Sequence, residues 1–413
     1  MNESTISNNN EDGQLKSNSK DNNNNIDSNL SLNNNYNKFT ILLNQVINNN
    51  SSHSNSINSS LYILGNKFIN LIQANNYINN LIYFTYRCGF EPIPKTIDGP
   101  QPIQFFPSII FNKSTLINFT NLKSLFDKEN FTSDSGWGCM IRTSQNLLAN
   151  TLLKLNKNKD NMTEDIINLF QDSSSCKFSI HNFIKTASES PLQIKPGQWF
   201  GPNAASFSIK NLIELSQAND ANNLLIPQVF ISDNCDLYDD EITILLELKP
   251  LLLLFPVRLG IDQVNKYYHQ SILQLLSTKH SVGISGGKPS SSFYFIGYEE
   301  QEEGNVELLY FDPHFPQVYE NPINVNTYRT KNYNKLKIED LDPSMMIGIL
   351  LNNVNDYLNF KKQCIETKNK ILHFHPEFHN NDLTNQSWEE IQEVEDDFVN
   401  LNIRNDDEEF IQL

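Results

Sequence analysis

Cysteine is scarce in this 413-residue sequence, and the five cysteines are widely spaced. They stand at positions 88, 139, 176, 235 and 364; their number is odd, and no two form a Cys-x-x-Cys pair. This pattern argues against a disulfide framework and against a cysteine-based zinc site. Because free cysteines are typical of a reducing compartment, we expect a cytoplasmic location.

Positive charge and long apolar runs are also in short supply. Lys and Arg number 31 against 48 Asp and Glu, and the resulting net charge of -17 argues against nucleic acid as a partner. The longest apolar run, residues 251–257, is interrupted by Pro256 and is far too short to cross a bilayer. The first residues lack the basic and apolar regions of a secretory signal.

No metal ion or cofactor is expected. His373, His375 and His379 have a spacing that fits no strong ligand pattern, and Pro376 interrupts any helix there. Residues 283–290 read GISGGKPS, which lacks the spacing of a phosphate-binding loop and has a proline directly after the lysine. We therefore interpret this segment as a tight turn that leads into a strand at Ser292.

The composition divides the chain into three regions. Residues 1–60 are dominated by Asn and Ser, which offer too little apolar surface to offset the entropy of ordering, so this extension is predicted to be disordered. Residues 61–376 carry the apolar patterns of a folded domain. Residues 377–413 form an acidic tail, since positions 387–413 hold ten acidic residues and one basic residue, Arg404.

The folded region predicts an α+β protein in which one helix is buried against an antiparallel sheet. Apolar residues at spacings of three and four after Gly138 predict that buried helix. Alternation and short apolar runs predict strands elsewhere, and the last two strands form a hairpin. The expected helices otherwise cover residues 77–87 and 262–276, and the expected strands cover 228–231, 251–257, 292–298 and 306–312.

Cys139 lies in the first turn of the predicted buried helix, just after Gly136 and Gly138. A helix N-terminus favours negative charge and has exposed backbone N–H groups, so it can stabilise a thiolate and can bind an oxyanion. A small cysteine buried in the core is the alternative interpretation. These surroundings alone leave both interpretations open.

A thiol nucleophile needs a base, and the base needs an orienting group. Asp312-Pro313-His314 closes the second strand of the predicted hairpin. Residues two apart on a strand point to the same face, and Pro313 favours an extended conformation at Asp312. The carboxylate of Asp312 can therefore hold the imidazole of His314 in one tautomer. A strand-end turn with a solvated aspartate is the competing explanation.

Several long motifs in this order are similar to those of one family. They are SDSGWGCMIR at 133–142, GQWFGPN at 197–203, RLGID at 258–262, SVGISGGKPSS at 281–291 and DPH at 312–314. With YILG at 62–65 and FTYR at 84–87, they make residues 61–350 resemble the autophagins, the autophagy-related cysteine proteases. The resemblance implies a papain-like catalytic domain with a small auxiliary subdomain.

The resemblance also implies an activity and its partners. Autophagins cut a ubiquitin-like autophagy modifier after a C-terminal glycine, and they hydrolyse the amide that joins this glycine to phosphatidylethanolamine. The partners would therefore be the precursor and the lipid-conjugated form of such a modifier, with transient access to autophagic membranes. By position, Cys139 matches the nucleophile, His314 the base and Asp312 the orienting residue. Tyr86 matches a tyrosine that helps the oxyanion hole, and Trp199 matches a tryptophan that gates the substrate tail.

The end of the acidic tail carries one further motif. Phe410-Ile-Gln-Leu413 follows four acidic residues at 406–409, where packing into the core is not expected. Such a peptide can add a strand to a partner sheet, with Phe410 and Leu413 entering pockets. It resembles the family's C-terminal modifier-binding motif.

Three other functions remain open from the sequence. A papain-like deubiquitinase or an acyl transferase could use the same three residues. A non-catalytic adaptor could bind the modifier through its tail, although the intact set of Cys139, Asp312 and His314 argues against this class.

Overall fold

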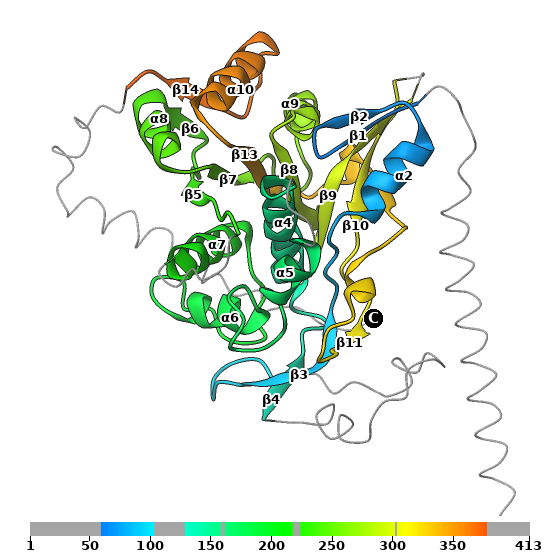
Figure 1. Ribbon diagram of the computed structural model, residues 1–413, viewed down its shortest axis with the longest axis vertical. Helices are drawn as coiled ribbons and strands as arrows, with labels where there is room; N and C mark the ends of the chain where they lie inside the picture. Colours follow the sequence, from blue (N-terminus) through cyan, green and yellow to red (C-terminus); the bar gives the residue numbers. More distant parts are fainter. Residues whose placement is uncertain (1–58, 103–128, 158–161, 218–223, 302–303, 378–413) are drawn as a thin grey trace, which may run out of the picture. The chain divides into compact units, whose positions relative to one another are not determined.

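The computed structural model describes residues 59–102, 129–157, 162–217, 224–301 and 304–377 (Figure 1). The Asn-rich extension, 1–60, and the acidic tail, 377–413, lie almost wholly outside these ranges, and the motif at Phe410 and Leu413 lies entirely outside. The three-region organisation and the tail motif therefore stay predictions.

A nine-stranded sheet forms the centre of the described part of the chain. All pairs of neighbouring strands in this sheet are antiparallel, except the pair β5 and β7, which is parallel. β1 (Ser60–Ile63) pairs with β9 and with β2 (Asn66–Phe68). The order across the rest of the sheet is β12 (Asn334–Lys337), β10 (Val306–Phe311), β9 (Ser291–Glu300), β8 (Ser281–Lys288), β13 (Ser344–Leu351), β7 (Leu251–Arg258) and β5 (Gln228–Ile231).

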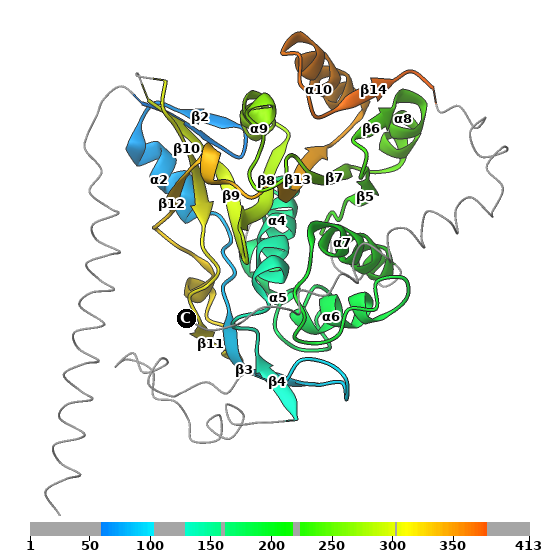
Figure 2. The same cartoon turned by 180° about the vertical axis from the view of Figure 1, so that it is seen from behind.

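The sheet separates two apolar cores, because alternate side chains of a strand point to opposite faces. In β7, Leu252 and Leu254 enter one core, whereas Leu251, Leu253 and Phe255 enter the other. The first core is covered by α4 (Cys139–Leu155), α5 (Met162–Asn168), α6 (Ile180–Ser188) and α7 (Pro202–Gln217). The second is covered by α8 (Asp239–Leu248), α9 (Lys266–Ser277) and α10 (Val354–Glu366) (Figures 1 and 2).

The α+β class, the buried helix and the four strands expected from the sequence are confirmed. The structure extends that expectation, because helices cover both faces of the sheet and not one. The helix expected over 262–276 begins at Lys266, where the side chain of Asn265 accepts a hydrogen bond from the Tyr267 N–H and acts as the N-cap.

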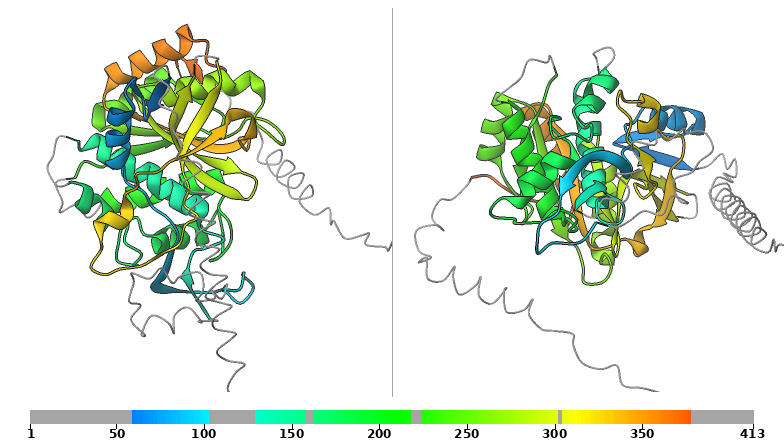
Figure 3. Two further views of the ribbon diagram at one scale, coloured as in Figure 1. Left: turned by 90° about the vertical axis from the view of Figure 1, so that its right-hand side faces the viewer. Right: turned by 90° about the horizontal axis from the view of Figure 1, so that it is seen from below.

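Short elements complete the described chain. β3 (Arg87–Pro94) lies between β11 (Gln317–Val318) and β4 (Asn130–Ser133) in a three-stranded sheet, beyond one end of α4 (Figure 3). β14 (His373–His375) pairs with β6 (Asp236–Tyr238). The 3-10 helices η3 (Val325–Tyr328) and η4 (Ile338–Asp340) connect strands.

The helix predicted over residues 77–87 is wrong. The structure has α2 at Leu71–Asn79, followed by an extended segment into β3. Asn146 and Asn150 of α4 explain the difference, because their side chains bond the backbone of this segment. The Asn146 side chain accepts from Phe84 N at 2.6 Å and donates to its carbonyl at 3.1 Å. Asn150 does the same for Ile82, at 3.0 and 2.8 Å.

The tight turn predicted for residues 283–290 is also wrong in extent. Most of the segment belongs to β8, and the turn is confined to Pro289 and Ser290. The glycines serve close packing: a Cβ at Gly287 would come within 1.8 Å of the Ser291 carbonyl oxygen, and one at Gly286 within 2.9 Å of Met345 Cβ.

Candidate active site

Cys139 is the first residue of α4, and its surroundings leave the helix end open toward the thiol. The N-cap is Gly138, which offers no side chain to bond the first N–H groups. Gly136 has a φ of 87°, a left-handed conformation that glycine adopts without strain and that turns the chain into the helix. The thiol lies in a partly desolvated site, since Cys139 is 8% exposed. The geometry favours a thiolate near free backbone donors.

His314 and Asp312 lie just beyond the end of β10 and contact each other. His314 Nδ1 and Asp312 Oδ1 are 2.6 Å apart, and the same oxygen accepts the His314 backbone N–H at 3.0 Å. This bond directs Nδ1 to the carboxylate and leaves Nε2 as the atom that can exchange a proton with the thiol. The Tyr83 hydroxyl donates to the Asp312 carbonyl, which fixes the turn.

Two aromatic rings hold the imidazole between them. Tyr86 meets His314 edge to face, with ring centroids 5.3 Å apart and an interplanar angle of 86°. Phe293 of β9 does so at 5.5 Å and 77°. The Tyr86 N–H also donates to the Pro313 carbonyl at 2.8 Å. The base is therefore restrained by two segments that are far apart in the sequence, those of Tyr86 and Phe293.

The pKa values of the thiol and the imidazole shift toward a charged pair. Burial opposes the thiolate, but the hydrogen bond and charge of His314, with the Ser292 backbone N–H and the Tyr86 hydroxyl, lower the pKa of Cys139 below its ordinary value. Burial likewise opposes the imidazolium, but Asp312 and Cys139 outweigh it and raise the pKa of His314 to about 9. Both shifts favour thiolate and imidazolium at neutral pH.

Tyr86 places its phenol beside the thiol. Burial first, then the negative charges of Cys139 and Asp134, raise the pKa of this hydroxyl well above its ordinary value. The group consequently stays protonated at neutral pH and can act as a hydrogen-bond donor. A donor held beside the reacting thiol can stabilise an oxyanion.

Trp199 lies on the rim of a cavity of about 140 Å³ that opens beside Cys139. Its indole N–H donates to the Gly136 carbonyl at 2.8 Å, while the side chain is 55% exposed. The tryptophan is thus tethered at one edge and free at the other. The remaining lining residues are Trp137, Met140, Phe200, Pro202, Gly286, Gly287, Lys288, Ser290, Ser291, Ser292, Asp342 and Ser344.

A buried group of charges supports the loop before Cys139. Arg142, one turn into α4, donates to Asp134 at 2.7 Å and to Asp172 through two bonds of 2.9 Å. Asp134 also accepts the Arg87 N–H at 2.7 Å, and its carbonyl accepts the Gly138 N–H at 2.8 Å. Strand β3, which begins directly after Tyr86, and the N-cap of the helix that carries Cys139 are both bonded to Asp134.

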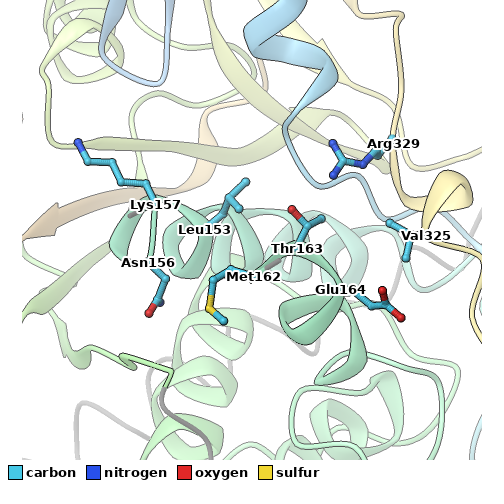
Figure 4. A pocket seen from close by; sticks show the side chains of 8 residues that line it. All are labelled: Leu153, Asn156, Lys157, Met162, Thr163, Glu164, Val325 and Arg329. Carbon is cyan, nitrogen blue, oxygen red and sulfur yellow. The ribbon is translucent and has the colours of Figure 1, made fainter. Parts of the chain in front are cut away.

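A larger cavity of about 420 Å³ lies at the other end of α4 (Figure 4). Among the described residues that line it there is no cysteine or histidine, so these residues offer no thiol paired with an imidazole. The smaller cavity beside Cys139 therefore remains the candidate active site. The larger one is lined by Leu153, Asn156, Lys157, Met162, Thr163, Glu164, Val325 and Arg329.

The structure brings together the sequence-predicted Cys139, Asp312, His314 and Tyr86, and Trp199 lines the adjoining cavity. Sequence reasoning missed the buried charges around Arg142. An arginine on the apolar face of a buried helix was a usable signal, because a buried cation requires a partner. Within the described residues, no group of three His, Cys, Asp or Glu side chains could hold a metal ion. No helix among them is long and apolar enough to span a membrane.

A helix that presents a thiol to a histidine at the end of a neighbouring sheet strand defines a papain-like cysteine protease. Comparison with known proteins agrees: residues 72–363 match the family of the peptidase C54 catalytic domain. The chain therefore belongs to the peptidase C54 family, the autophagins.

Curated relatives have the same character. The chain is 58% identical over 361 residues to "Cysteine protease ATG4" of Candida albicans, a match that covers 86% of this chain and 79% of the relative. It is 51% identical over 336 residues to "Probable cysteine protease ATG4" of Debaryomyces hansenii, covering 77% and 67%. A third, also named "Probable cysteine protease ATG4", from Scheffersomyces stipitis, is 45% identical over 372 residues, covering 88% and 69%. The chain is thus an autophagy-related cysteine protease.

Proposed function

We propose that this protease cuts a ubiquitin-like autophagy modifier after its C-terminal glycine and also hydrolyses the amide that joins this glycine to phosphatidylethanolamine. The observation that carries the proposal is the contact of Cys139, His314 and Asp312 beside a small cavity. We place the reaction in the cytoplasm, where the enzyme meets both the precursor and the lipid-conjugated modifier. Access to autophagic membranes is transient and comes through the lipidated substrate.

The chemistry proceeds through a thioester. The Cys139 thiolate attacks the glycine carbonyl carbon, and the developing oxyanion accepts hydrogen bonds from backbone N–H groups at the start of α4 and from Tyr86. When the carbon–nitrogen bond breaks, protonated His314 gives its proton to the leaving amine. His314 then takes a proton from water, which hydrolyses the thioester and releases the modifier with a free glycine carboxylate. Asp312 orients the imidazole throughout and stays ionised.

Selectivity for glycine comes from the small size of the cavity, which excludes larger residues, and not from a pocket that binds a side chain. A glycine offers no side chain to hold, and the cavity beside Cys139 is small and is lined in part by Trp199. A movement of Trp199, tethered only at its indole N–H, would admit the narrow modifier tail. The remaining specificity then comes from the folded face of the modifier.

The decisive experiment is cleavage of a C-terminally extended modifier by wild-type and Cys139→Ala protein. The wild type should release the extension after glycine, and the variant should release none. Full activity in the variant would show that Cys139 is not the nucleophile. Ubiquitin fusions form the second arm: cleavage as fast as that of modifier fusions would favour the deubiquitinase alternative. Binding without any cleavage by the wild type would favour the adaptor.

The acidic tail belongs to the same proposal. We propose that Phe410 and Leu413 bind the modifier, since an aromatic and an aliphatic residue three apart, after four acidic residues, can add a strand to a partner sheet. Deletion of residues 410–413 should weaken modifier binding while a short peptide substrate is cut at the normal rate. Equal affinity for the modifier before and after deletion would reject this role.

A further inference from the structure

The catalytic thiol has two distinct sides. The cavity that Trp199 helps to line is also lined by Cys139 but not by His314. A general acid must lie within about 3 Å of the nitrogen that it protonates, so the leaving amine has to lie against His314. The acyl part of the substrate then occupies the cavity, and the leaving group passes the His314 side.

Phe315 is the residue that directly follows His314, and its side chain is 53% exposed. Consecutive Cα atoms are about 3.8 Å apart, so the backbone of Phe315 lies beside the imidazole that the leaving group passes. Tyr86 holds both ends of this turn: its N–H donates to the Pro313 carbonyl at 2.8 Å, and its carbonyl accepts the Gln317 N–H at 2.9 Å. An exposed aromatic residue is thus carried on a restrained turn beside the general acid.

The two substrates of the proposed function differ only on this side of the thiol. In a precursor, the leaving group is a water-soluble peptide amine. In the lipid-conjugated form, it is the ethanolamine of a phospholipid whose glycerol and acyl chains lie in a bilayer. The net charge of -17 gives the protein no general attraction to an anionic membrane. The glycerol and acyl region of the lipid carries no charge, so contact with it on this side comes from apolar groups.

We propose that Phe315 is a specificity-determining residue that contacts the glycerol and acyl region of the phospholipid leaving group at the bilayer surface. This inference rests on the proposed function. An aromatic ring at a membrane interface gains free energy by removing its apolar surface from water. Phe315 should therefore favour the lipid amide over the peptide bond, while the acyl side of the site treats both substrates alike.

The test compares two reactions of one enzyme. Wild-type and Phe315→Ser proteins are assayed on a soluble C-terminally extended modifier and on the same modifier conjugated to phosphatidylethanolamine in neutral phosphatidylcholine vesicles. We expect the ratio of lipid-amide to precursor cleavage, as kcat/KM, to fall about ten-fold in the variant. Phe315→Leu should restore most of the ratio, because leucine keeps an apolar side chain.

Leu358→Ser provides the matched control. Leu358 is likewise 53% exposed, but it lies on α10, which covers the second core and lies away from the β10–β11 connection (Figures 1 and 2). This variant should leave the ratio at its wild-type value. When detergent disperses the vesicles, the wild type and Phe315→Ser should also differ less in their ratio of lipid-amide to precursor cleavage.

The outcomes separate the inference from the proposed function. If the wild type cuts neither substrate, the proposed function fails. If it cuts both and Phe315→Ser slows them equally, Phe315 contacts the modifier or supports His314, and the lipid contact is wrong. An unchanged ratio with normal rates also overturns it. A variant that unfolds is recognised by loss of its thermal transition, and Phe315→Gln, which is also polar but keeps a longer side chain, then repeats the comparison.

Discussion

Gly138 lies directly against Asp134, so that a Cβ at Gly138 would come within 2.6 Å of the Asp134 Cβ. Asp134 cannot move away, because it is fully buried and bonded to Arg142 and to the Arg87 N–H. The residue before the nucleophile must therefore be a glycine for a steric reason. The close approach sets the position of Cys139 at the start of α4.

Gly138→Ala should consequently impair both folding and catalysis. The overpacked contact is expected to cost about 1–3 kcal/mol in the free energy of unfolding and to displace the thiol. Denaturant unfolding and kcat/KM would measure the two effects. Gly201→Ala is the control, since a Cβ at Gly201 meets no atom within 4 Å. Equal behaviour of the two variants would contradict the steric role.

Arg142→Met should strongly destabilise the protein. The substitution leaves the buried carboxylates of Asp134 and Asp172 without their cation, and breaking a buried ion pair in this way costs about 3–5 kcal/mol. Chemical denaturation would measure the loss. The exposed pair of Lys362 and Glu366, 3.8 Å apart, gives the comparison: Lys362→Met should change the free energy by less than about 0.5 kcal/mol. A small effect at Arg142 would mean that the carboxylates find other partners.

Activity should be bell-shaped in pH. The acid limb follows the lowered pKa of Cys139, and the alkaline limb follows loss of the His314 proton near pH 9. In Asp312→Asn the alkaline limb should move to lower pH, because the carboxylate helps to raise the pKa of His314. An alkaline limb that stays near pH 9 in this variant would assign that limb to another group.

The same shift links His314 to stability. Its pKa in the folded protein, about 9, exceeds the value of about 6.5 expected in the unfolded chain. The stabilisation from protonated His314 is therefore complete below about pH 6.5 and is lost as the pH rises through about 9. When the pH is raised from 6 to 10, the free energy of unfolding should fall less in His314→Ala than in the wild type, as measured by denaturant unfolding at both pH values. An equal decrease in the free energy of unfolding in both proteins would exclude protonation of His314 as the source of the stabilisation.

Tyr86→Phe should lower kcat with little change in KM. The phenol hydroxyl lies beside the thiol and is a donor to the oxyanion only as the reaction proceeds, so its removal is expected to cost about 10²-fold in kcat. Steady-state kinetics on the extended modifier would separate kcat from KM. The variant keeps the ring that contacts His314, so a change confined to KM would point to substrate positioning instead.

Cys139 should be the cysteine that reacts first with iodoacetamide and with peroxide. Its pKa is lowered, whereas burial raises the pKa of Cys88, Cys235 and Cys364 to about 12. Peptide mapping after brief alkylation at pH 7 should find the label at position 139. Peroxide should inactivate the enzyme and a thiol reductant should restore it. Activity that persists under peroxide would contradict the accessible thiolate.

The local sequence determined much of this protein. Two glycines before an apolar helical pattern predicted the position of Cys139, and Asp312-Pro313-His314 at a strand end predicted a carboxylate beside an imidazole. Both patterns act over a few residues, where backbone geometry alone decides the outcome. The strand spans likewise follow from side-chain alternation and short apolar runs.

Only the tertiary structure decided the rest. The segment from Ile82 to Tyr86 is extended and not helical, because Asn146 and Asn150, more than sixty residues later, bond its backbone. The same pairing brings Tyr86 to the thiol, and the ion pairs of Arg142 fix the loop between them. These contacts join segments that are distant in the chain. Their energies come from burial and from partners that no local pattern contains.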